Sequence, residues 1–63
     1  MSLVSAVAQC NIDRLEQVYA LLVELDDSAM VTRLSEEMDT SIPALMESVS
    51  AFIGALRIER DAA

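Results

Sequence analysis

The chain has 63 residues, a formal net charge of −7, 54% hydrophobic residues and a mean hydropathy of +0.40. A single domain of this length buries little surface, so it usually needs a disulfide, a metal, very regular helix packing or a partner. One cysteine excludes an intramolecular disulfide, and the lack of histidine excludes a thiolate–imidazole zinc site. The apolar content argues against disorder, and one glycine with one proline leaves little material for strand turns, so an all-α fold is expected.

The first periodic segment, residues 2–25, predicts one long amphipathic helix. Its aliphatic residues occupy an arc of roughly 160° on a helical wheel, with Asp13, Glu16 and Glu24 on the other side. A heptad pattern also fits, with one seam position at Ala8, Leu15 and Leu22 and the other at Val4, Asn11, Val18 and Leu25.

Asn11 is the polar residue of this seam and has more than one interpretation. A buried seam asparagine can fix the register and the oligomeric state of a coiled coil. It can equally act as the N-cap of a helix that starts here, with Asp13 in its first turn. A third reading gives it neither role.

A short turn is expected at residues 26–28, where two aspartates and a serine can cap the next helix. The second periodic segment, about residues 28–60, carries apolar residues that recur every 11 positions. A repeat of this length stays on one face of a nearly straight α-helix. It is seen in the series Val31, Ile42, Ile53 and the series Leu34, Leu45, Leu56.

Pro43 lies inside the second segment and is the only proline of the chain. Because the apolar series continue in phase across it, we favour one helix that is kinked near residues 39–43, with Pro43 on its convex, solvent side. The alternative is a real break, with Thr40 or Ser41 capping a third helix and Ile42 displaced from α geometry.

The expected architecture is an antiparallel helical hairpin of one domain, residues 1–63. Two helices cannot cover two wide apolar faces, so a second copy is expected to complete a four-helix bundle as a homodimer. The residues expected at the oligomer or partner interface are Asn11, Leu15, Val18, Leu22, Leu34, Met38, Leu45, Met46, Val49, Phe52 and Leu56.

A catalytic function is not expected, because the chain contains neither histidine nor lysine and Cys10 has no neighbouring base. Cys10 is interpreted as a surface residue. The carboxylates at 26–27, 36–37 and 39 lack the spacing of an EF-hand and the Glu-x-x-His pattern of a di-iron bundle, so they are assigned to a solvated surface. No cofactor, metal or small-molecule substrate is expected.

Nucleic acid and membrane are not expected partners. Four arginines stand against 11 acidic residues, whereas phosphate binding needs a basic surface. No run approaches the roughly 18 apolar residues of a membrane span. The lone cysteine and the absence of a signal-peptide pattern predict a cytoplasmic protein.

Methionines and small residues of the second segment offer further hints of partner binding. Met30 and Met38 are interpreted mainly as core residues, and Met46 as the better surface candidate. Gly54 in mid-helix has two interpretations: it allows the backbone of another helix to approach closely, or it has no structural role.

These features favour a small acidic helical module that self-associates and binds a protein partner, of the adaptor, anti-activator or co-chaperone type. The alternative is an acidic mimic of nucleic acid that occupies a basic target protein, since −7 charges are carried by only 63 residues.

Overall fold

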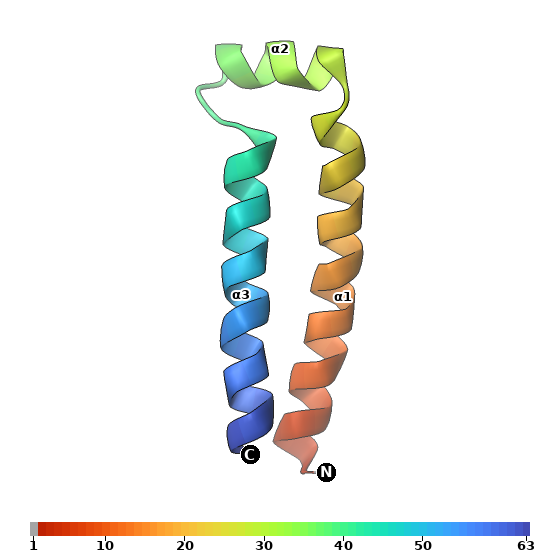
Figure 1. Ribbon diagram of the computed structural model, residues 1–63, viewed down its shortest axis with the longest axis vertical. Helices are drawn as coiled ribbons and strands as arrows, with labels where there is room; N and C mark the ends of the chain where they lie inside the picture. Colours follow the sequence, from red (N-terminus) through yellow and green to blue (C-terminus); the bar gives the residue numbers. More distant parts are fainter. Residues whose placement is uncertain (1) are drawn as a thin grey trace.

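The computed structural model describes residues 2–63 and is all-helical over that range, which confirms the expected all-α class. It contains α1 (Leu3–Asp26), α2 (Ala29–Glu37) and α3 (Ile42–Ala62). The long helices α1 and α3 lie side by side and run antiparallel, so both chain termini lie at one end, while α2 crosses the other end (Figure 1). The molecule measures 44 × 17 × 12 Å along its principal axes, so α1 and α3 form a layer one helix thick.

The turn between α1 and α2 falls where the capping residues predict it. The amide of Ser28 donates to the carbonyl of Leu25 at 3.0 Å, which closes the last turn of α1. Ser28 itself is extended, and its Oγ accepts a hydrogen bond from the amide of Val31 at 3.3 Å. This N-cap satisfies one of the free amides at the start of α2.

The expectation of one continuous kinked helix is wrong, because α2 and α3 are separate helices that bend by 91° between them. The break begins at Asp39, which has a φ of 54°. The amide of Asp39 donates to Glu36 at 3.4 Å and the amide of Thr40 donates to Ser35 at 3.1 Å. This pair of bonds is the Schellman arrangement that ends helices, with aspartate at the left-handed position where glycine is usual.

The new helix starts with a serine cap, as the alternative interpretation proposed. Ser41 is extended, and its Oγ accepts from the amide of Ala44 at 3.2 Å. Pro43 lies in the first turn of α3, where its missing amide hydrogen costs no helical hydrogen bond. Ile42 is the first residue of α3, so its expected displacement from α geometry does not occur.

The backbone at Asp39 predicts opposite effects of two substitutions. A left-handed conformation costs an L-residue roughly 1–2 kcal/mol, and a β-branched side chain tolerates it least. We expect Asp39→Val to lower the free energy of unfolding by about 1–2 kcal/mol, whereas Asp39→Gly leaves it unchanged or raises it. Urea denaturation measures both. Asp27 is the matched control, because its φ of −81° gives glycine no advantage there. Equal stability of Asp39→Val and the original chain would contradict the break.

The core lies between α1 and α3 and is small. Within residues 2–63, its buried apolar side chains are Ala8, Ile12 and Ile53, and Ser5 is buried beside them. The chain exposes 4658 Å², whereas a monomeric protein of this mass exposes roughly 4,000 Å². The excess of roughly 650 Å² follows from a layer whose two broad faces have nothing packed on them.

Candidate interaction surface

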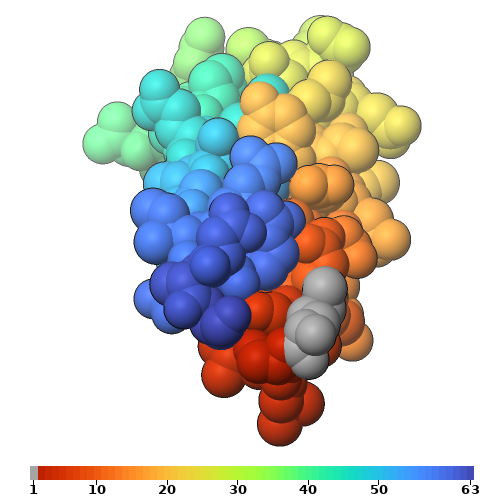
Figure 2. Space-filling model, turned by 60° about the horizontal axis from the view of Figure 1, so that its bottom comes forward, coloured from red at the N-terminus to blue at the C-terminus, as the bar shows by residue number. Residues whose placement is uncertain are grey.

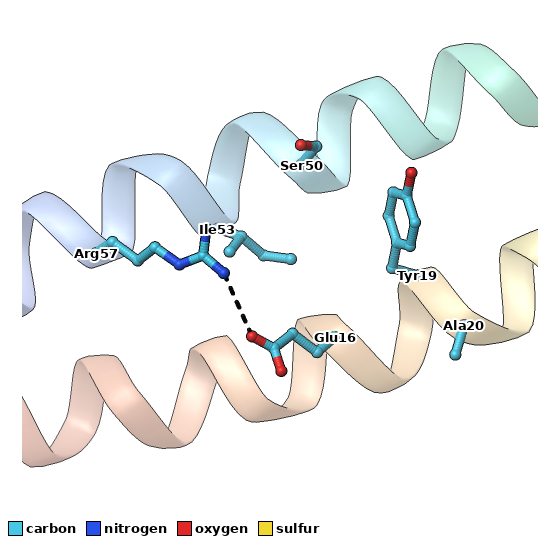
Figure 3. Close-up of a pocket in the computed structure, with 6 residues that line it drawn as sticks. All are labelled: Glu16, Tyr19, Ala20, Ser50, Ile53 and Arg57. Atoms are coloured by element: carbon cyan, nitrogen blue, oxygen red, sulfur yellow. Dashed lines mark ion pairs between the residues drawn. The ribbon is translucent and has the colours of Figure 1, made fainter.

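One broad face of the layer is polar and links α1 to α3 through side-chain bridges. Arg57 and Glu16 approach to 3.6 Å between Nη2 and Oε1 (Figure 3). Arg60 donates from Nη1 to Oε1 of Gln9 at 2.8 Å. Both partners of the Arg57 pair are more than half exposed, so this pair contributes at most about 1 kcal/mol. The bridges therefore align the helices more than they stabilise them.

A shallow pocket of about 320 Å³ lies on this polar face. Tyr19 extends from α1 toward α3 at one side of it, and Ile53 forms its floor between the helices (Figure 3). Ser50, Ala20 and the Arg57–Glu16 pair complete the lining. The lining holds no nucleophile with an adjacent base. What the pocket offers to a bound group is its concave shape and one ion pair.

Arg60 links α3 to α1 at the end of the layer that holds both chain termini. There the last turns of α3 lie against the first turns of α1 (Figure 2). Its backbone carbonyl accepts a hydrogen bond from Oγ of the buried Ser5 at 2.8 Å. Its Nε donates to Oδ1 of Asp61 at 2.9 Å, and this hydrogen bond raises the pKa of Arg60 and lowers the pKa of Asp61. The stabilising contribution of Asp61 is therefore present above the ordinary pKa of aspartate and is lost as the pH falls through its lowered value.

The opposite broad face is apolar, and we call it the apolar face. Helical spacing places its residues on one side of the buried Ile12 and Ile53. Glu16 and Arg57 of the polar face lie on the other side. Its exposed members are Val4, Val7, Val18 and Leu25 of α1 with Leu45 and Phe52 of α3, and partly buried Asn11 and Leu56 lie between them.

One hollow lies on the apolar face, and a second lies beside it at the outer edge of α3. One of about 380 Å³ lies near the chain termini and is lined by Leu3, Val4, Val7, Ala8, Asn11, Leu56 and Glu59. The other, of about 360 Å³, lies on α3 beside Phe52 and is lined by small residues, namely Ser48, Ala51 and Ala55. An apolar surface with hollows next to a protruding aromatic ring is typical of helix–helix contacts.

The predicted interface residues divide into two groups. Those that are partly buried between the helices are Asn11, Leu15, Leu22, Met46, Val49 and Leu56. Those that are exposed are Val18, Leu34, Met38, Leu45 and Phe52. Leu34 lies in α2 and Met38 caps its C-terminus, at one end of the molecule, so the structure does not bring them into line with Leu45.

Two interpretations of single residues are wrong. Asn11 lies well inside α1, so it caps no helix. Met30 and Met38 are 67% and 70% exposed, whereas Met46 is partly buried, which reverses the expected assignment of core and surface methionines. The cause is the break at Asp39, which turns α2 out of line with α3 and leaves its methionines uncovered.

Exposed Val4, Val7 and Leu25 belong to the apolar face but were not among the predicted interface residues. All three lie within the apolar arc of the first segment. Val4 and Leu25 also lie on the predicted heptad seam, so their signal was present. Val7 lies outside the seam, because a seam is a narrower line than the face that two packed helices leave open.

Comparison with known proteins gives no match to any family model, to any curated protein or to any solved structure. Within residues 2–63, no single helix is long and apolar enough to cross a membrane; α2 and α3 pass that test of length and composition only when joined across their 91° bend. The same residues contain no group of three or more metal-ligating side chains close enough to hold an ion. The apolar face is therefore the feature of the molecule from which a function can be inferred.

Gly54 gives a prediction that separates its two interpretations. A Cβ built at Gly54 meets nothing within 4 Å, and the residue lies on the wheel near Glu47 and Asp61, away from the apolar face. We expect Gly54→Ala to raise the free energy of unfolding by about 0.5–1 kcal/mol, because alanine favours a helix interior. Thermal unfolding followed by circular dichroism measures this. A destabilised variant would mean that another backbone packs closely at Gly54.

Proposed function

We propose that the protein is a small helical interaction module whose α1–α3 hairpin self-associates through the apolar face into a four-helix bundle and binds a further protein. The observation that carries the proposal is the contiguous apolar face on a layer one helix thick. An exposed patch of this kind on a small protein marks an interaction site. In this proposal the module is not an enzyme and acts as a cytoplasmic adaptor, anti-activator or co-chaperone.

The surface area supports a second copy as the occupant of the apolar face. The chain's excess surface of roughly 650 Å² approaches the roughly 800 Å² per partner that a stable interface buries. Val4, Val7, Val18, Leu45 and Phe52 would all lose solvent contact in such a bundle. Antiparallel helix pairs that stack two by two form the common four-helix arrangement.

The polar face remains available for a protein partner when the apolar face is occupied. It offers the hollow at Tyr19 and Ile53 and the Arg57–Glu16 ion pair. Tyrosine and arginine beside a hollow are the residue types that most often anchor protein–protein contacts.

One observation favours the alternative, an acidic mimic of nucleic acid. Six of the 11 carboxylates lie at the α2 end of the molecule, where Arg33 is the one basic residue. The six are Glu24, Asp26, Asp27, Glu36, Glu37 and Asp39. A target held mainly by these charges would be released by salt, because exposed charges are screened beyond about 8 Å at physiological ionic strength.

Sedimentation equilibrium of the purified full chain tests the proposed self-association. The expected result is a dimer of twice the 6.9 kDa chain mass, with dissociation on dilution. A cooperatively folded species that stays at 6.9 kDa at concentrations of about 100 μM would contradict the proposal. For a captured protein partner, binding that survives high salt supports the module, and complete release by salt supports the mimic.

A further inference from the structure

We infer that the second copy docks antiparallel, so that the α2 end of one copy lies over the chain termini of the other. This inference rests on the proposed self-association and specifies its geometry. A closed dimer uses the same surface on both copies, which are related by a twofold axis. When two apolar faces meet, this axis can run parallel to the helices or perpendicular to them. An axis along the helices puts the two α2 ends together, and an axis across them puts each α2 against its partner's termini.

The charge distribution opposes bringing the α2 ends together. That end carries six carboxylates and Arg33, a net charge of −5, whereas residues 57–61 carry two arginines and two carboxylates and are neutral. A partner's α2 end would therefore meet a terminal end without net charge, where Glu59 is the one charged residue among residues 2–63 that lines the hollow. Like charges placed together across an interface are costly, so the antiparallel arrangement avoids the main repulsion.

The shapes of the two ends also fit each other. The side of α2 with Thr32, Ser35 and Glu36 faces a hollow shared with Pro43, on the polar side of the layer. Helical spacing then puts Met30, Leu34 and Met38 toward the apolar face, where they are exposed. At the other end lies the hollow of about 380 Å³ between the start of α1 and Leu56. Methionine side chains fill irregular gaps well, so the protruding end of one copy suits the hollowed end of the other.

Phe52 lies at the middle of the antiparallel arrangement. It is the central residue of α3, ten positions from both Ile42 and Ala62. An axis across the helices at this level stacks α3 on its partner's α3 and brings the two Phe52 rings together. Each ring then lies beside the small residues Ser48 and Ala55 of the facing helix, which help to line a hollow. The parallel arrangement puts Phe52 against α1 instead.

Pulsed dipolar spectroscopy on spin-labelled full-length protein distinguishes the two orientations. Exposed Cys10 is first replaced by serine. A single label at Thr32→Cys, an exposed position on the polar side of α2, reports the distance between the α2 ends. A single label at Ser50→Cys, in the middle of α3 and outside the apolar face, reports dimer formation in either orientation. Circular dichroism of each labelled chain checks that it is folded.

We expect the Thr32 labels to lie about 40 Å or more apart, since α2 marks one end of a molecule 44 Å long. The Ser50 labels should lie within about 25 Å of each other, because stacked helices are 8–10 Å apart. A Thr32 distance of about 25 Å or less in a dimer overturns the antiparallel orientation and leaves the proposed function standing. Absence of dipolar coupling at both positions, with sedimentation as a monomer, overturns both.

Discussion

Replacing Phe52 with glutamate is expected to dissociate the dimer into monomers. Phe52 is 65% exposed in the single chain, so a charged side chain there is solvated and removes no contact from the core between α1 and α3. In the proposed bundle the same position is central and dry, and an unpaired carboxylate there costs several kcal/mol. We expect the dissociation constant of the dimer to rise at least about 100-fold, which corresponds to about 2.7 kcal/mol.

The matched control for Phe52→Glu is Ile58→Glu in the same helix. Ile58 is 71% exposed, but helical spacing places it away from the apolar face. Both variants lose one large apolar side chain and gain one negative charge, so general effects of charge are equal. Sedimentation should show a monomer for Phe52→Glu and a dimer for Ile58→Glu. Dissociation by both variants, or by neither, would rule out the apolar face as the interface.

Truncating Ile12 to alanine is expected to be the most destabilising single change within the chain. Ile12 is 1% exposed and is the largest fully buried side chain of residues 2–63. Removing a buried isoleucine usually costs 2–5 kcal/mol, and here no second core layer can compensate. Because a domain of this size has a total stability of only about 3–5 kcal/mol, we expect Ile12→Ala to lose its cooperative unfolding transition at 25 °C.

Ile58→Ala serves as the control for Ile12→Ala, since it removes the same atoms from an exposed position. We expect it to change the free energy of unfolding by no more than about 0.5 kcal/mol. Urea denaturation followed by circular dichroism measures both variants at one protein concentration. A loss of less than about 1 kcal/mol for Ile12→Ala would show that the α1–α3 contact is not the centre of the core.

The first helix and the turn after it were predictable because every local signal agrees. Ser2 and Ser28 cap α1 and α2 through their hydroxyl oxygens, and no proline or glycine interrupts the residues between them. The break after α2 was not predictable from periodicity, because the apolar series stay in phase across it. What ends α2 is a left-handed Asp39, where glycine is the usual signal. The local signals of the break were Ser41 and Pro43, which supported only the alternative interpretation.

The division of apolar residues between core and open surface could be predicted only in part. An arc of roughly 160° is wider than one neighbouring helix can cover, so part of it must stay open, but the wheel does not show which part. The structure closes α1 on α3 over Ser5, Ala8 and Ile12 and leaves Val4 and Val7 outside. Small side chains at Ser5 and Ala8 allow the helices to approach at the terminal end, where the hydrogen bond from Ser5 to Arg60 fixes them.

The thinness of the α1–α3 layer has a consequence for how the protein behaves at different abundances. A chain whose residues 2–63 bury three apolar side chains has little folding free energy of its own, so most of the stability of the proposed bundle comes from association. By mass action, the melting temperature of such a protein rises with its concentration. Newly made chains at low copy number would be exposed to proteolysis, and accumulation would protect them. Doubling the rate of synthesis would then more than double the amount of folded protein.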